Sequence, residues 1–169
     1  PLLARVQKPA RYIGGEGGSL TPRHGDGVVS WLLVYPDTYE IGLPNQGLQI
    51  LYELVNEHPR GAAERAYAPW VDLEAEMRAH GVPLFSVDTH RAAREFDVIG
   101  FNLSAELNYT NLLNYIDLAG VPVRQAERRD GDPLVCAGGH CTYNPEPLAD
   151  FLDFVVLGDG EEVIAEITS

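Results

Sequence analysis

The stretch VVSWLLVYPDTYEIG, residues 28–42, combines an apolar strand with a polar loop and decides the fold. Its first eight residues are almost continuously apolar, which is typical of a strand buried on both faces of a parallel sheet. Pro44 and Asn45 then introduce a helix whose apolar residues share one face at helical spacing, namely Leu48, Leu51, Tyr52 and Val55. The stretch predicts the first strand-to-helix unit of an α/β domain, with its strand at the centre of the sheet.

The alternation of strands and helices continues along the rest of the chain. Further strands are expected at residues 65–68, 97–102, 134–137 and 154–157, with another short extended piece at 84–87. Helices are expected at residues 72–80, with Asp72 as N-cap and Gly81 beyond the end, at 106–119 before Gly120, and from about 160 onward. Such an order requires right-handed crossovers and a parallel sheet. The sequence thus predicts a three-layer flavodoxin-like (Rossmann-like) α/β sandwich with about five mainly parallel strands.

The first 27 residues differ from this pattern, because they are polar and rich in glycine. They include GGEGG at residues 14–18, which precedes the first strand. A phosphate-binding glycine loop must instead follow a strand and open a helix. We therefore expect an N-terminal arm at residues 1–27 and an α/β domain at residues 28–169.

Length and charge limit the classes of function. A chain of 169 residues with 45% hydrophobic content is long enough for one domain with its own core. The formal net charge of −13 disfavours nucleic acid as a partner. Apolar runs of about eight residues are well short of the roughly 20 needed to span a bilayer, and no signal-peptide pattern opens the sequence. We expect a cytoplasmic protein with no membrane partner.

The two ends of the sequence point to a longer protein. The first residue is Pro1 rather than Met, and Ser169 falls inside a predicted helix. The chain is therefore expected to be a fragment.

Two cysteines, Cys136 and Cys141, lie close together in CAGGHC, with His140 beside the second. The pattern is consistent with half of a metal site or with a redox pair. It is also consistent with buried residues at the end of a strand. Cys136 ends an apolar strand, where cysteine behaves as a small hydrophobe, and no second ligand pair exists elsewhere. No metal is predicted.

The polar and glycine-rich loops all follow predicted strands. In an open parallel sheet, ligands bind beyond the carboxyl ends of the strands, where the strand order reverses. The loops at residues 35–42, 102–107, 138–140 and 158–161 should therefore converge on one edge. Gly138 and Gly139 suit either a tight turn or the close approach of a flat ligand. Tyr39 and Trp70 are aromatic residues that either line a cavity or pack in the core. Glu161 and Glu162 either act as acid–base groups or stabilise the helix by complementing its dipole.

A resemblance rests on PDTYEIG, GLQILYELVN, APW and LFSVDT, and on the stretches at residues 35–56 and 137–162. With these, nearly the whole chain resembles the N-terminal cobalamin (B12)-binding-like domain of a radical S-adenosylmethionine (SAM) protein family. The resemblance implies a cofactor-binding module that covers a separate radical SAM barrel of the same chain, expected after residue 169. The barrel would hold a [4Fe-4S] cluster through CxxxCxxC and bind S-adenosylmethionine. Because that spacing is absent from this sequence, no catalytic residue is assigned to the segment itself.

The same resemblance implies which residues face the cofactor. They are Asp37, Thr38, Tyr39, Gly42, Asn102, Ser104, Gly138, Gly139, His140, Gly158 and Gly160.

The chain departs from the family pattern at the position of the cobalt ligand. Domains that replace the cofactor's own base use DxHxxG after the first strand, whereas Tyr39 stands in the histidine position here. A neutral phenol, with an ordinary pKa of about 10, is a poor cobalt ligand. Asn102 likewise replaces an expected serine. If cobalamin binds, we expect its lower face to be free of protein nitrogen.

A second sequence resembling the ligand loop is DTH at residues 88–90. It has Ala93 where the pattern requires glycine, and it follows a short strand. We expect it to form a solvated turn.

Three kinds of function remain open. The first is a module that binds cobalamin or a related corrinoid. The second is a degenerate cobalamin-domain fold that serves as a scaffold or protein-interaction module without a cofactor. A flavin or phospho-receiver protein is the third, and it is disfavoured because neither a Ser/Thr-Gly phosphate loop nor clustered acids with an opposed lysine are present.

Overall fold

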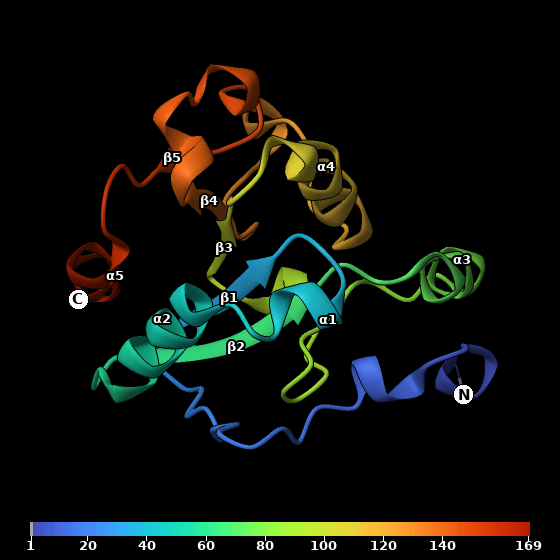
Figure 1. The fold of residues 1–169 in the computed structure, drawn as a ribbon. Helices are drawn as coiled ribbons and strands as arrows, with labels where there is room; N and C mark the ends of the chain where they lie inside the picture. The colour runs from blue at the N-terminus through green and yellow to red at the C-terminus, as the bar shows by residue number, and fades with distance from the viewer. Residues whose placement is uncertain (1) are drawn as a thin grey trace.

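The strand predicted from residues 28–35 is β1 (Val29–Tyr35) in the computed structural model, which describes residues 2–169. It pairs in parallel with β2 (Gly61–Tyr67) on one side and β3 (Val98–Asn102) on the other. β4 (Leu134–Gly138) and β5 (Phe154–Val155) continue the sheet, giving the order β2-β1-β3-β4-β5 (Figure 1). All pairings are parallel, so the predicted flavodoxin-like α/β fold is confirmed, although β3 rather than β1 is the middle strand.

Helices cover both faces of this sheet. α2 (Gln46–Glu57) and α5 (Gly160–Thr168) lie on one face, and α3 (Val71–His80) and α4 (Tyr109–Leu118) lie on the other (Figure 1). α1 (Tyr39–Gly42) is a single turn after β1. Short 3₁₀ segments complete the described part: η1 (Leu2–Arg5), η2 (Pro9–Tyr12), η3 (Ala93–Glu95), η4 (Glu106–Asn108), η5 (Gln125–Glu127), η6 (His140–Tyr143) and η7 (Glu146–Leu148).

The two-residue period of the strands produces the three layers. Within β1, Leu32 and Val34 belong to the core beneath α3 and α4, whereas Trp31 and Leu33 belong to the core beneath α2 and α5. Successive side chains of a strand point to opposite faces, so one apolar strand supplies both cores. This explains why residues 28–35 contain almost no polar position.

Several predicted boundaries differ from the structure. β2 begins at Gly61 instead of residue 65, and β5 has two residues instead of four. Asn45 is the N-cap of α2 and accepts a hydrogen bond from the backbone N–H of Leu48, as the sequence indicated. Asp72 is not the N-cap of α3: Trp70 occupies that position, and Asp72 lies in the first turn.

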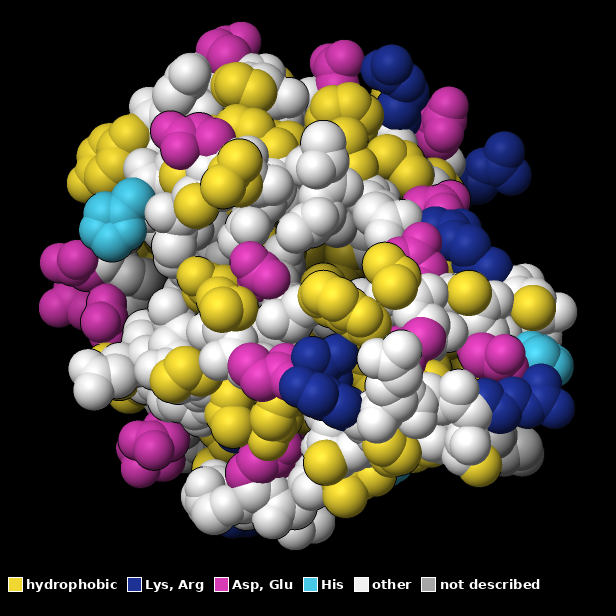
Figure 2. Space-filling model, turned by 45° about the vertical axis from the view of Figure 1, so that its right-hand side comes forward, with side chains coloured by type: hydrophobic (Ala, Val, Ile, Leu, Met, Phe, Trp, Pro, Cys, Tyr) yellow, Lys and Arg dark blue, Asp and Glu magenta, His cyan; other side chains and the backbone are white. Residues whose placement is uncertain are grey.

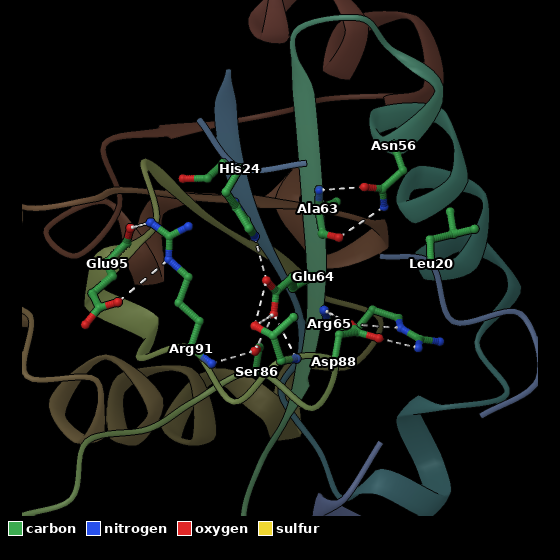
Figure 3. Close-up of polar contacts among 12 residues, drawn as sticks. Leu20, His24, Asn56, Ala63, Glu64, Arg65, Ser86, Asp88, Arg91 and Glu95 are labelled. Carbon is green, nitrogen blue, oxygen red and sulfur yellow. Dashed lines mark hydrogen bonds and ion pairs between the residues drawn. The ribbon is translucent and has the colours of Figure 1, made fainter. Parts of the chain in front are cut away.

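The free edge of β2 is closed by side chains and by the backbone N–H of Val87, which donates to the carbonyl of Arg65, rather than by another strand (Figure 3). Asn56 donates to the carbonyl of Ala63 and accepts from its N–H, both at 3.0 Å. Asp88 accepts from the N–H of Arg65 at 2.7 Å. Because unpaired edge groups invite other strands, these side chains protect the sheet from edge-to-edge association.

Charged side chains within β2 are buried beneath the N-terminal segment and the loop before β3. Glu64 is fully buried and accepts from the hydroxyls of Ser86 and Thr89, with His24 at 2.6 Å. Arg65 pairs with Asp88 at 2.7 Å (Figure 3). It also donates to the hydroxyl of Ser19 at 2.8 Å. Residues 13–24 are thereby fastened along this edge of the sheet.

No helix of residues 2–169 is long and apolar enough to cross a membrane.

Candidate functional site

A cavity of about 370 Å³ lies between the sheet and helices α2 and α5, near the carboxyl ends of the strands. Its apolar walls come from both sides, with Trp31 and Leu33 on β1, Leu48 on α2 and Ile164 on α5. In the strand order 2-1-3-4-5, the switch point at which ligands bind lies between β1 and β3. Residues of both strands line this cavity, so it occupies the position that the topology favours for a ligand.

Glycines form much of the remaining lining: Gly47, Gly100, Gly138, Gly139, Gly158 and Gly160. A Cβ on Gly100 would lie 3.4 Å from Cζ3 of Trp31 and 3.6 Å from Sγ of Cys136, so the added carbon would be at ordinary contact distance and would take up cavity space. Gly138 similarly has its nearest neighbour, Val156, at 3.8 Å. The missing side chains therefore create room beside the sheet.

Gly139 has a different role from Gly138. Its φ of +107° is unfavourable for other residues, and a Cβ would approach the carbonyl oxygen of Leu103 to 2.7 Å. The backbone turn itself requires this glycine. Of the two uses that the sequence left open for the pair, the turn applies to Gly139 and the open space to Gly138.

Polar side chains at the cavity follow three strands, β3, β4 and β5, and include Asn102, His140, Asp159 and Glu161. Asn102 is the best positioned, because its amide nitrogen lies 3.4 Å from Oδ1 of Asn45 and its oxygen accepts from the hydroxyl of Ser104 at 2.9 Å. A few fixed polar groups around apolar walls are typical of small-molecule pockets.

The structure brings together six of the residues assigned from the sequence: Asn102, Gly138, Gly139, His140, Gly158 and Gly160. Ser104 is linked to them through its hydrogen bond to Asn102. The four residues of the loop after β1 do not line this cavity. Asp37 and Thr38 line a second, smaller one, together with Trp70.

Tyr39 packs against the protein instead of facing the glycine-lined cavity. Its ring meets that of Tyr67 edge-on, with centroids 5.5 Å apart. Burial, together with a hydrogen bond to Glu16, raises the pKa of Tyr39 to about 12. Gly42 fits beneath the same aromatic pair, since a Cβ there would lie 2.4 Å from the Tyr67 ring. The phenol is neutral at physiological pH, and the residues of this loop do not fit the role of a cobalt ligand.

The sequence did not identify the apolar residues that line the cavity, because their pattern indicated only core residues. They are Trp31, Leu33, Leu51, Cys136, Ile164 and Ile167. One available signal was the alternation along β1 and the glycine at position 100 of β3, which together indicate a sheet face with too few side chains to fill it.

The DTH segment forms a turn in which Thr89 and His90 are exposed, as expected, but the side chain of Asp88 is buried instead of solvated. The side chain of Asp88 is 1% exposed and pairs with Arg65, while the hydroxyl of Thr89 donates to Glu64. His90 has a φ of +62° and lies 2.8 Å from the carbonyl of Tyr12. These residues fasten the N-terminal segment and the edge of β2.

Both cysteines are free thiols. Burial raises the pKa of Cys136 to about 12, and burial also raises the pKa of Cys141. Within residues 2–169, no three His, Cys, Asp or Glu side chains are grouped as metal ligands.

Comparison with known proteins gives one match. A family model described as "Radical SAM proteins, N-terminal" matches residues 47–169, well over half of the chain. Searches of curated proteins and of solved structures gave no significant match. The family match covers the cavity residues of α2, β3, β4 and α5, and it starts after the loop that carries Tyr39.

Proposed function

The chain belongs to the family of N-terminal regions of radical SAM proteins, and from this premise we propose that it is a corrinoid-binding module whose cavity takes the nucleotide base of cobalamin. The family implies a radical SAM catalytic region in the same protein, with its [4Fe-4S] cluster and S-adenosylmethionine there. The module described by residues 2–169 then contributes binding and positioning, and the catalytic region contributes the radical chemistry.

The glycine-edged cavity is the observation that carries this proposal. Its volume of about 370 Å³ falls within the range of pockets for small ligands. A flat heteroaromatic base with its ribose suits such a space, whereas the corrin macrocycle with its side chains is too large to enter. The walls around Trp31 and Leu33 would bury the faces of the base, and Asn102 offers donor and acceptor groups to its polar atoms.

The cobalt ion receives no ligand from Tyr39 in this proposal. The phenol is directed to Tyr67 and has a raised pKa, so both its position and its protonation state oppose coordination. When bound, the corrinoid would supply its cobalt as the reactive centre, and this chain would bind and orient it.

Exposed apolar side chains support the proposal that another part of the protein covers the carboxyl edge of the sheet. They follow all five strands: Ile41 after β1, Trp70 and Val71 after β2, Leu107 after β3, Tyr143 after β4 and Leu157 after β5. Leu107 is the extreme case, at 88% exposed. Figure 2 shows one face of the molecule, on which hydrophobic side chains lie between charged ones. Clustered exposed apolar groups mark interaction surfaces, and we assign this one to the catalytic region of the parent protein.

A scaffold without a cofactor is the second candidate, and the closed loop after β1 favours it. Tyr39, Tyr67 and Gly42 fill the space where a ligand loop would open. Calorimetry with cobalamin separates the two candidates: saturable binding by the chain supports the corrinoid module, and no binding by the folded chain supports the scaffold.

Tyr39→Phe is expected to leave both cobalamin affinity and the visible spectrum of the bound cofactor unchanged, because the phenol oxygen makes no bond to cobalt. Absorbance titration of the two proteins tests this. Tyr39→His is the matched variant, and it should also leave the spectrum unchanged, since position 39 packs on Tyr67. A shift of the cobalt spectrum in the histidine variant would place this loop next to the metal and contradict the account.

A further inference from the structure

We propose that the second cavity, on the face of the sheet opposite the corrinoid site, binds a small organic cation, with Asp37 as its charge partner and Trp70 as an aromatic wall. The cavity has a volume of about 240 Å³ and lies between the start of α3, α4 and the loop after β1. This binding site is separate from the proposed corrinoid function, since the two cavities share no lining residue.

The charge of the lining selects the sign of the ligand. Asp37 and Glu74 are the charged residues that line the cavity, and both are acidic. Glu74 is already engaged, since it accepts from Arg78 and from Asn114, each at 3.0 Å. Asp37 accepts only the N–H of Thr38, at 2.7 Å, and within residues 2–169 no basic side chain lies within ion-pair distance of it. A half-buried carboxylate without a counter-charge favours a cationic partner.

Hydrogen-bond acceptors around Asp37 are also unused. Asn111 donates its amide N–H to the carbonyl of Pro36 at 3.0 Å, which fixes the orientation of the amide. Its oxygen accepts no hydrogen bond from the described residues. A ligand with several N–H donors, such as an ammonium group, suits this set.

Trp70 supplies the apolar wall that an organic cation requires. Its indole is 42% exposed, and its backbone N–H is held by the hydroxyl of Tyr12 at 3.0 Å. Arg11 lies over one side of the ring at 5.1 Å and pairs with Glu40 at 2.8 Å, so the indole already makes one cation–π contact within the protein. Cations are attracted to aromatic rings in this way.

An anionic ligand is disfavoured at the same place. The N-terminus of α3 alone would attract negative charge, but its first turn carries Asp72 and Glu74. These carboxylates offset the helix dipole. No lysine, arginine or histidine among the described residues lines the cavity.

Three monocyclic aromatic probes of similar size and different charge test the proposal: benzylammonium, benzyl alcohol and benzoate. Each is titrated into the ¹⁵N-labelled chain, and the indole N–H of Trp70 and the side-chain amide of Asn111 are followed by NMR. We expect saturable shifts with benzylammonium, at least about tenfold weaker binding of benzyl alcohol, which corresponds to about 1.4 kcal/mol, and none with benzoate. Equal binding of all three probes, or shifts with none of them, would overturn the proposal that this cavity binds cations.

Single-residue variants test whether the probe binds at Asp37 and Trp70. Asp37→Asn should weaken benzylammonium at least about tenfold, and Trp70→Leu should weaken it through loss of the aromatic wall. Asp117→Asn removes an exposed carboxylate of α4 outside the cavity and should leave the affinity unchanged. Unchanged benzylammonium binding in both Asp37→Asn and Trp70→Leu, each with a native-like spectrum, would contradict the assignment of the cation site to this cavity. Gly100→Val blocks only the other cavity and should have no effect on this probe.

Discussion

Asp88→Ala is expected to lower the free energy of unfolding by about 3–5 kcal/mol, because it leaves a buried guanidinium without its main counter-charge. The side chains of Arg65 and Asp88 are 2% and 1% exposed, and their nearest atoms lie 2.7 Å apart. Burial alone would lower the pKa of Arg65, but the hydrogen bond and charge of Asp88 outweigh it and raise the pKa. The variant also removes the acceptor for the N–H of Arg65 on the free edge of β2. Urea unfolding followed by circular dichroism measures the change.

Asp117→Ala is the matched control for this loss. Asp117 pairs with Arg78 at 2.8 Å, but both side chains are about half exposed. Exposed pairs contribute about 0–1 kcal/mol, since solvent screens them. A similar small loss in both variants would show that Asp88 is dispensable and that the N-terminal segment is held by other contacts.

Gly100→Val is expected to weaken cobalamin binding by at least about a hundredfold, or about 2.7 kcal/mol. The new side chain projects from β3 into the cavity beside Trp31 and Cys136 and occupies the space of the base. The fold should tolerate it, because the added Cβ meets its neighbours at ordinary contact distances and valine favours strands. Calorimetry with cobalamin gives the affinity of both proteins.

Gly17→Val serves as the control for adding the same side chain elsewhere. Gly17 is exposed, lies in a turn and has no atom within 4 Å of an added Cβ. Its cobalamin affinity should equal that of the unaltered chain. If Gly100→Val also binds cobalamin normally while remaining folded, the cavity is not the corrinoid site.

Most of the sheet could be predicted from sequence because its interior strands are apolar on both faces. β2 was predicted only in part, from residue 65 instead of Gly61, because GAAERAY contains the charged residues Glu64 and Arg65. Their burial depends on partners far along the chain, with His24 40 residues away from Glu64 and Asp88 23 residues away from Arg65. Local patterns carry no information on such pairings. The same pairings explain why the side chain of Asp88 is buried, although Thr89 and His90 beside it are exposed.

The site was predictable to the extent that strand ends determine it. Glycines and polar residues after β3, β4 and β5 do meet at one cavity, as the topology of an open parallel sheet requires. The loop after β1 diverges because its single helical turn directs Tyr39 onto Tyr67, a contact between distant segments. The apolar walls were hidden for another reason: a residue that lines a cavity and a residue of the core have the same sequence signal.

The central claim, that the glycine-lined cavity takes the nucleotide base of a corrinoid, is tested most directly by comparing cobalamin with dicyanocobinamide, which has the corrin ring but no nucleotide. Both are titrated into the chain by calorimetry, with 5,6-dimethylbenzimidazole riboside as competitor. The account predicts saturable cobalamin binding, binding of dicyanocobinamide at least about a hundredfold weaker, and displacement of cobalamin by the riboside. Equal affinity for the two corrinoids, without competition by the riboside, would contradict it.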